Sequence, residues 1–182
     1  NPITIYLTGA TIDNPDIFSP STTGEDFPIL MLSNVNLIGQ GEDLTILDAE
    51  ETNRVIQIGI TSQSSYCGND DICGSKNNII SDLTMTRGHA MNNTEPTQWQ
   101  AGGGVLAMYP ENLSFENVTI RNSMGSRGGG IYVGNGHNAS RSHLGLSLSN
   151  VNISDNAASD NYVCYSITDP AQCMEYDWQW FM

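Results

Sequence analysis

The chain has 182 residues, long enough for one domain with a sizeable core, and only 14% of them are charged. Its 20 acidic and 6 basic residues give a formal net charge of −14. Such a surface repels nucleic acids and anionic membranes, so we expect neither as a partner. No apolar run reaches the roughly 18 residues that a membrane span needs, so we expect no membrane insertion. Asn, Ser, Thr and Gly supply the polarity and favour short strands and tight turns over helices.

In chain order, the sequence predicts three parts of a single domain over residues 1–182. Residues 1–23 are predicted to form an N-terminal coil or cap that begins with the strand-like "NPITIYL". Residues 24–156 are predicted to form repeated coils, with a loop insertion near residues 88–101. Residues 157–182 are predicted to form a disulfide-closed cap or a docking tail.

One pattern recurs along the chain: apolar-x-apolar-x-Asn/Asp-apolar-x-apolar. It occurs in "NIISDLTMTRG" from Asn78, "LSFENVTIRNS" from Leu113 and "LSLSNVNISDN" from Leu146, and in an earlier copy, "LMLSNVNLIGQ", from Leu30. The shared position holds Asn34, Asp82, Asn117 and Asn150, the last three spaced 35 and 33 residues apart. Alternation with a period of two predicts strands with one buried face, and the central Asn or Asp predicts a sharp bend.

A glycine-led element also repeats, as "GGGVLAM" at Gly102 and "GGGIYVG" at Gly128, 26 residues apart. Each unit therefore predicts a strand, a bend, a second strand and a glycine-led third strand. Such units bury their apolar faces when they stack, which predicts an all-β parallel solenoid of roughly five or six three-strand coils. For one coil we predict inward-facing Leu113, Phe115, Val118 and Ile120, a corner at Gly128 to Gly130, and a third strand that starts at Ile131 and Val133.

Residues 24–58, "GEDFPILMLSNVNLIGQGEDLTILDAEETNRVIQI", resemble the opening coils of many secreted bacterial β-helix proteins. Over about residues 24–156 the chain resembles the right-handed parallel β-helix superfamily, the pectate-lyase-like fold. The Phe-led Asn motif and the Gly-Gly-x-Ile element also resemble the repeats of polymorphic outer-membrane proteins and related adhesins. Those repeats have two residues between Phe and Asn, whereas one residue separates Phe115 from Asn117. The resemblance implies a right-handed parallel β-helix, and enzymes of this superfamily cleave acidic polysaccharides.

Candidate catalytic residues follow from the needs of such cleavage. β-Elimination next to a uronate requires a base and positive charge that neutralises the carboxylate. Arg87, His89 and Arg121 are the candidates. The repeat alignment places Arg87 in a turn column with Asn122 and Asp155, and Arg121 one column earlier with Thr86 and Ser154. The alternative is that these are solvent-facing turn residues spaced by the coil.

Trp99 lies in the predicted loop insertion, "HAMNNTEPTQWQAGG". Its ring is a candidate platform for stacking on a sugar, because long loops in compact folds often carry function. The alternative is a Trp that folds down and covers the side of the coil.

The four cysteines form two local pairs, Cys67 with Cys73 and Cys164 with Cys173, without the CxxC spacing of a zinc site. We expect two short-range disulfides and a secreted or cell-surface location. Five Asn-x-Ser/Thr sequons are glycosylation candidates: Asn92, Asn112, Asn117, Asn138 and Asn152. Asp70 and Asp71 are candidate calcium ligands or solvated loop acids, and no other cofactor is expected.

The tail "CMEYDWQWFM" is rich in aromatic residues. Trp178, Trp180 and Phe181 are predicted either to cap the end of the stack or to pair with the first coil of another molecule. The sequence therefore favours a non-enzymatic extracellular structural or adhesive module, with itself as the partner in end-to-end stacking. The alternative is a carbohydrate-active protein, either a polysaccharide lyase-like enzyme or a glycan-binding module, with an extracellular glycan as its partner.

Overall fold

The computed structural model describes residues 2–59, 75–92, 100–134 and 145–158. Over these residues the chain is all-β, with one short 3₁₀ segment, η1 (Ala90–Asn92), and no α-helix. The strands of the first part of the chain are β1 (Ile3–Tyr6), β2 (Asp16–Phe18), β3 (Ile29–Met31), β4 (Val35–Ile38), β5 (Thr45–Asp48) and β6 (Ile56–Ile58). They are followed by β7 (Lys76–Thr86), β8 (Val105–Met108), β9 (Glu111–Arg121), β10 (Met124–Gly125), β11 (Ile131–Gly134), β12 (Leu146–Ser154) and β13 (Ala157–Ala158).

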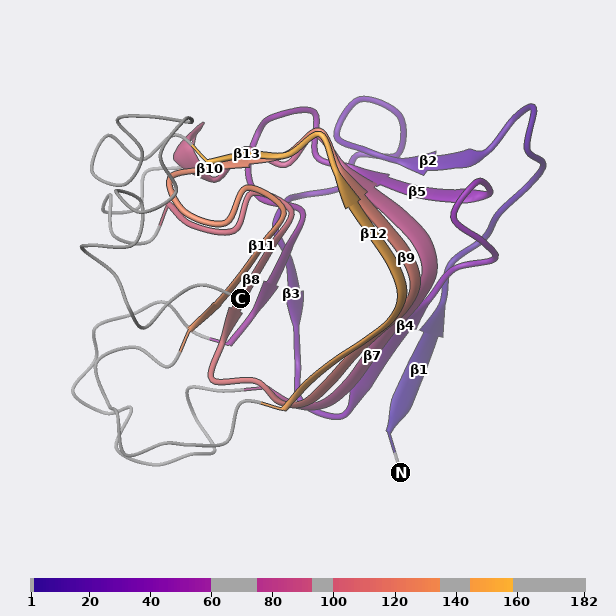
Figure 1. Cartoon of the computed structure of the whole chain (residues 1–182). Coiled ribbons are helices and arrows are strands. Elements are labelled where there is room, and N and C mark those ends of the chain that lie inside the picture. The colour runs from indigo at the N-terminus through magenta and orange to yellow at the C-terminus, as the bar shows by residue number, and fades with distance from the viewer. Residues whose placement is uncertain (1, 60–74, 93–99, 135–144, 159–182) are drawn as a thin grey trace.

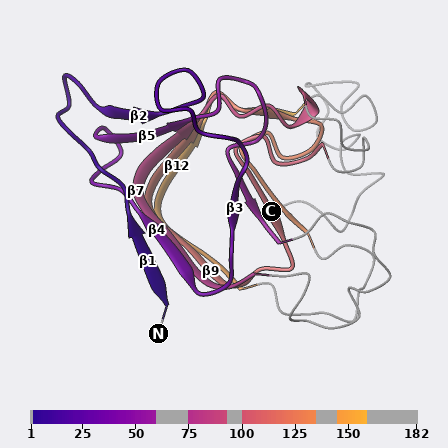
Figure 2. The same cartoon turned by 180° about the vertical axis from the view of Figure 1, so that it is seen from behind.

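The named strands pair in parallel and stack into sheets of seven, four and two strands. In the seven-stranded sheet, β4 pairs with the first half of β7 and β5 pairs with its second half. β1 pairs with β4, and β2 pairs with β5. β9 pairs with β7 as well, and β12 follows β9. The four-stranded sheet has the order β11-β8-β6-β3, and the small sheet pairs β10 with β13. Figure 1 looks along this stack, and Figure 2 shows it from behind. The predicted all-β, parallel, stacked architecture is confirmed, and it is compatible with a β-helix or solenoid.

The predicted repeat alignment is confirmed for the three later copies. Asn78 pairs with Leu113, and Leu113 pairs with Leu146, as the gapless alignment requires. The glycine-led elements also align, because Val105 of β8 pairs with Ile131 of β11. Sequence positions that share a repeat slot therefore share a column, by which we mean the same register position in successive strands.

The earliest copy of the repeat is shifted from its predicted register. We predicted that Asn34 would occupy the slot of Asp82, but Leu37 pairs with Ile80 and Ile38 pairs with Ser81. Gly39 therefore lies beside Asp82, whereas Asn34 lies one corner earlier and bonds Asn77. The prediction was wrong because both corners carry an Asn followed by an alternating apolar run.

The corners of the stack are built by residues with left-handed backbone angles. Two rows of side-chain hydrogen bonds connect them across strands. In the first row, the amide of Asn112 donates to Asn77 at 3.0 Å and that of Asn77 donates to Asn34 at 2.9 Å. In the second row, Asn150 donates to Asn117 at 3.0 Å and Asn117 donates to Asp82 at 2.9 Å. All six have φ between 52° and 60°, a region that Asn and Asp tolerate better than other side chains. The predicted bends at Asp82, Asn117 and Asn150 are therefore confirmed.

The core lies between the bent seven-stranded sheet and the four-stranded sheet. Leu113, Phe115, Val118 and Ile120 are all buried in it, as predicted. Ile131 and Val133 pack against the same cluster from β11. Burial of these alternating positions supplies the main stabilisation, at about 25 cal/mol per Å² of apolar surface removed from water.

The glycine-rich corner permits close contact between layers. Gly128 has a φ of 55°, as a turn at this position requires. A Cβ on Gly103 would lie 2.3 Å from the carbonyl oxygen of Met124, which is closer than real contacts allow. Gly103 therefore lets the strand after it approach the next layer.

Candidate functional site

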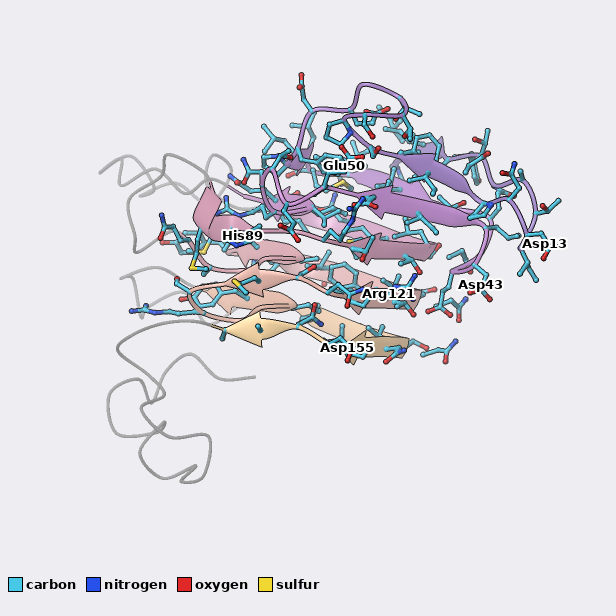
Figure 3. All side chains as sticks on the ribbon, turned by 90° about the horizontal axis from the view of Figure 1, so that it is seen from above. Asp13, Asp43, Glu50, His89, Arg121 and Asp155 are labelled. Atoms are coloured by element: carbon cyan, nitrogen blue, oxygen red, sulfur yellow. The ribbon has the colours of Figure 1, made fainter. Side chains whose placement is uncertain are left out.

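The predicted candidates Arg87 and Arg121 lie where β7 and β9 end. Thr86 pairs with Arg121, and Arg121 pairs with Ser154, so the predicted column is confirmed. Arg87, Asn122 and Asp155 follow these residues and have φ values of 50°, 52° and 55°, which places a corner at each of them. His89 lies further along the chain and bridges Met124. In Figure 3 the labelled His89 and Arg121 lie on different parts of the molecule, so these two candidates do not converge on one point.

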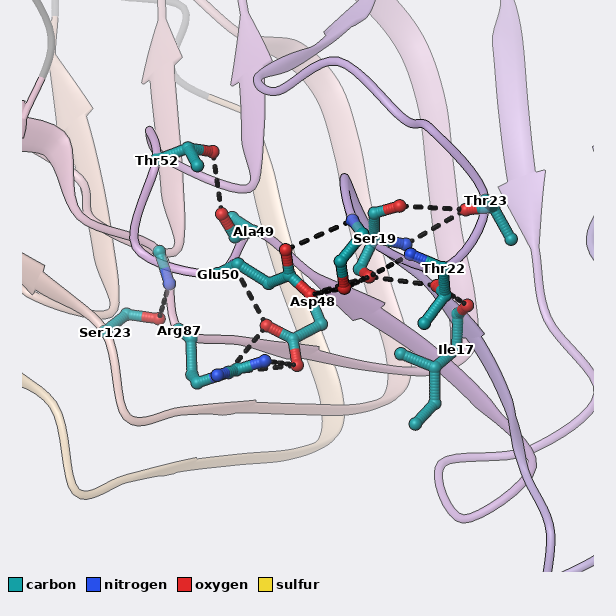
Figure 4. A network of polar contacts seen from close by, with 12 residues as sticks. Ile17, Ser19, Thr22, Thr23, Asp48, Ala49, Glu50, Thr52, Arg87 and Ser123 are labelled. Carbon is teal, nitrogen blue, oxygen red and sulfur yellow. Dashed lines mark hydrogen bonds and ion pairs between the residues drawn. The ribbon is translucent and has the colours of Figure 1, made fainter.

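Arg87 is engaged by Asp48 of β5. Its Nε donates to the two carboxylate oxygens at 2.8 and 3.0 Å, and its Nη2 donates at 2.6 Å (Figure 4). The Asp48 side chain is only 11% exposed, whereas that of Arg87 is 47% exposed. Hydrogen bonding to Asp48 raises the pKa of Arg87 above its ordinary value. A guanidinium that is held protonated by a carboxylate is poorly suited to act as a base.

A hydroxyl-rich network extends from this ion pair. The Glu50 backbone N–H donates to Asp48 at 3.0 Å, and the Glu50 carboxylate accepts hydrogen bonds from the Ser19 hydroxyl at 2.9 Å and the Ser21 N–H at 3.2 Å. The Ser21 hydroxyl donates to the same carboxylate. This hydroxyl bond is the main cause of a lowered pKa for Glu50, and Ser19 and the Ser21 N–H lower it further. These hydrogen bonds connect the loop after β2 to the corner after β5. Asp48 and Glu50 therefore both have a structural role.

The half-buried His89 has one ring nitrogen that is closed off from solvent. The His89 backbone N–H donates to the carbonyl of Asn53 at 2.9 Å. Its Nδ1 is buried and has no hydrogen-bond partner among the described residues. A general base needs a nitrogen within hydrogen-bond reach of a substrate, and the buried Nδ1 of His89 is not placed to act as one.

Arg121 is exposed at the end of β9 and, unlike Arg87, forms no ion pair with the described residues. The outward residues near it are Thr119, Asn152 and Ser154 of β9 and β12. The Thr119 hydroxyl donates to the Glu42 carboxylate at 2.7 Å. This strip offers hydroxyl, amide and guanidinium groups to solvent, which suits hydrogen bonding more than bond cleavage.

Sequence reasoning missed the partnership between Arg87 and Asp48. The two residues lie 39 residues apart in the chain. The available signal was the coil spacing, because the two residues occupy adjacent layers of one corner. Asp48, Glu50, Ser19 and Ser21 thus form the polar network that the sequence did not predict.

Several predicted sites lie outside the described residues. These are the cysteines Cys67, Cys73, Cys164 and Cys173, the calcium candidates Asp70 and Asp71, the sequon Asn138, and the aromatic residues Trp99, Trp178, Trp180 and Phe181. The side chain of Asn92 also lies outside them. Within the described ranges, no group of three or more His, Cys, Asp or Glu residues is arranged to hold a metal ion. No described helix is both long and apolar enough to span a membrane.

The remaining sequons have different surroundings. The side-chain nitrogens of Asn112 and Asn117, which a glycan would modify, donate to Asn77 and Asp82 in the two amide rows. Asn152 faces outward on β12 and is exposed. The structure therefore distinguishes two sequons that serve the corners from one that lies on the outer face.

Comparisons with known proteins identified no relative of this chain. No protein-family model matches the chain, and searches of curated proteins and of solved structures found no match.

Proposed function

We propose that this chain is a right-handed parallel β-helix that serves as a non-catalytic structural or adhesive module outside the cell. Stacked parallel strands, bent at recurring Asn and Asp corners, support the β-helix assignment. The predicted short-range disulfides and the sequons support an extracellular location.

The Arg87–Asp48 ion pair is the observation that carries the non-catalytic part of the proposal. Arg87 is one of the three candidate catalytic residues by sequence, and three hydrogen bonds direct it to Asp48. Among the described residues, neither His89 nor Arg121 forms a hydrogen bond or an ion pair with Arg87 or Asp48. Fold alone does not decide function, so the argument rests on these side chains.

The direct test is incubation of the full chain with a panel of neutral and uronate-containing polysaccharides, with calcium and with a chelator. Reducing ends report hydrolysis, and the absorbance of unsaturated uronates reports elimination. We expect no product under any condition, while a polysaccharide lyase run in parallel confirms the assay. Product released by the purified chain, and lost on Arg87→Ala with the fold intact, would overturn the proposal.

Glycan binding without cleavage is the second candidate function. It is favoured by the exposed Arg121 and the neighbouring outward Thr119, Asn152 and Ser154. A guanidinium among amide and hydroxyl groups can bind sugar hydroxyls and carboxylates. A glycan array probed with the wild-type chain and with Arg121→Ala tests it. Binding that Arg121→Ala removes supports this candidate, and binding that it leaves unchanged assigns recognition to another surface.

A further inference from the structure

Both ends of the described stack expose positions that are interior elsewhere. One column runs through Ile5, Leu37, Ile80, Phe115 and Leu148, by direct pairing at each step. Its middle members are 0–4% exposed, whereas Ile5 is 47% exposed and Leu148 is 49% exposed. Ile5 and Leu148 therefore have the position of core residues, and no described strand covers them on one side. Figure 3 shows β12 as the outermost described layer on one side of the stack.

The exposed apolar surface continues along the first layer. Ile3 and Tyr6 of β1 are 66% and 69% exposed, and Leu30 of β3 is 64% exposed. Ile3 shares the face of β1 that holds Ile5, so these two extend one exposed apolar surface, whereas Tyr6 lies on the opposite face of the strand.

The backbone at these ends is also open to pairing. β1 is paired with β4 alone and β12 with β9 alone among the described strands. Ile3 and Leu7 donate their N–H groups toward β4. Because successive residues direct their N–H groups to alternate edges, those of Thr4 and Tyr6 point away from β4. These groups present a template for a further parallel strand.

The two edge strands β1 and β12 carry no charge, whereas β2, the other edge strand of the first layer, carries Asp16. The interior strands β7 and β9 contain Lys76, Asp82, Glu111, Glu116 and Arg121. β1 (ITIY) and β12 (LSLSNVNIS) contain no charged residue. Edge strands usually carry charges or proline that prevent association, and these two lack that protection. In a chain of net charge −14, contact between these two uncharged strands limits the repulsion between copies.

From these observations we propose that the β1 end of the stack binds the β12 end of a second copy of this chain. β12 of one copy then pairs in parallel with β1 of the next, and Leu148 lies beside Ile5 in a continued interior column. The two ends are opposite edges of one sheet, so each copy retains a free end after pairing. Such a heterologous contact does not close and generates a linear assembly. The inference rests on the proposed structural role and specifies its partner and contact.

Sedimentation velocity of the full chain over a concentration series tests the proposal. We expect oligomers that grow with concentration, and we expect Ile5→Lys to weaken association by about tenfold or more, because an unpaired charge would enter the interface. Ile12→Lys is the matched control, since Ile12 is 72% exposed in the loop between β1 and β2. If Ile5→Lys is misfolded by circular dichroism, Thr4→Pro removes an outward N–H and keeps the bonds to β4. A wild-type monomer at every concentration would overturn the inference.

Cysteine cross-linking tests the register. Neighbouring strands are about 4.8 Å apart, within the range that a disulfide spans. Mixed Ile5→Cys and Leu148→Cys chains should form a disulfide dimer under mild oxidation, while Ile12→Cys mixed with Leu148→Cys should not. Dimers formed by Ile5→Cys alone would indicate pairing between two β1 ends and would overturn the head-to-tail contact. A monomer that cleaves no polysaccharide would sink this inference and leave the proposed function standing, whereas a monomer that cleaves one would remove both.

Discussion

Replacing Arg87 with Ala removes all three hydrogen bonds that it donates to Asp48, at 2.6, 2.8 and 3.0 Å. The Asp48 side chain is 11% exposed, so its carboxylate would keep the Glu50 N–H and lose its charged partner in a largely dry site. A hydrogen bond to a charged group contributes about 1.5–3 kcal/mol when buried. Because the Arg87 side chain is 47% exposed, we reduce the expected loss of unfolding free energy to about 1–2 kcal/mol.

Urea unfolding, monitored by circular dichroism, measures this loss of unfolding free energy. In a thermal melt of the same variant, we expect the melting temperature to fall by about 2–8 °C for a chain of this size. Arg87→Lys keeps the charge without the planar fork and should give an intermediate loss. Arg121→Ala is the matched control and should stay within about 0.5 kcal/mol, because Arg121 is exposed. An Arg87→Ala chain as stable as the wild type would refute the structural role that we assign to Arg87.

Three further substitutions test the network, the corners and the layer contacts. Serine hydrogen bonds lower the pKa of Glu50 from 4.5. Its contribution to stability is therefore present above that value and is lost as the pH falls through the folded-state pKa. Glu50→Gln should flatten acid unfolding curves below about pH 4.5. Asn117→Ala should cost about 1–2 kcal/mol in urea unfolding, through left-handed strain and broken amide bonds, while Asn152→Ala should change little. Gly103→Ala should cost about 2–3 kcal/mol, because its Cβ would meet a carbonyl at 2.3 Å, whereas Gly24→Ala meets no atom within 4 Å and adds only about 1 kcal/mol of backbone strain. Equal melting temperatures for the two glycine variants would contradict the layer contact.

The repeats of the later coils were predictable because strand alternation and corner chemistry coincide in them. In β7, β9 and β12 the apolar positions and the Asp or Asn keep the same offsets, so a gapless alignment gave the register of Leu113 and Leu146. The repeat spacing there is nearly constant, at 35 and 33 residues between the shared Asp or Asn positions. When the period is constant, residues at the same position of successive repeats lie side by side in neighbouring strands.

The first coils were harder to align for a physical reason. Between Gly39 and Thr45 the chain leaves the sheet before it returns as β5, so the halves that are continuous in β7 are separated here. Asn34 then matches two corners equally well by sequence. Only the hydrogen bond from Asn77 to Asn34 and the pairing of Leu37 with Ile80 distinguish them.

The sequence predicted which register positions the candidate residues occupy, but it did not predict which residues their side chains contact. Repeat alignment placed Arg87 and Arg121 at neighbouring corner positions, and the register agrees. It did not show that Arg87 would extend to the layer of β5 and bond Asp48. Side-chain direction at a left-handed corner depends on the partner in the next layer, which a pattern of residue types does not encode.

Hydrogen–deuterium exchange of the full chain, read by mass spectrometry at low and high protein concentration, tests the central claim most directly. That claim is a stack of parallel strands with closed middle layers and open ends that receive a second copy. We expect the slowest exchange in β7 and β9 at both concentrations, because strands pair with both of their edges. β1 and β12 should exchange faster at low concentration and become protected at high concentration. Exchange in β1 as slow as in β9 at low concentration, or independent of concentration in both end strands, would contradict the account.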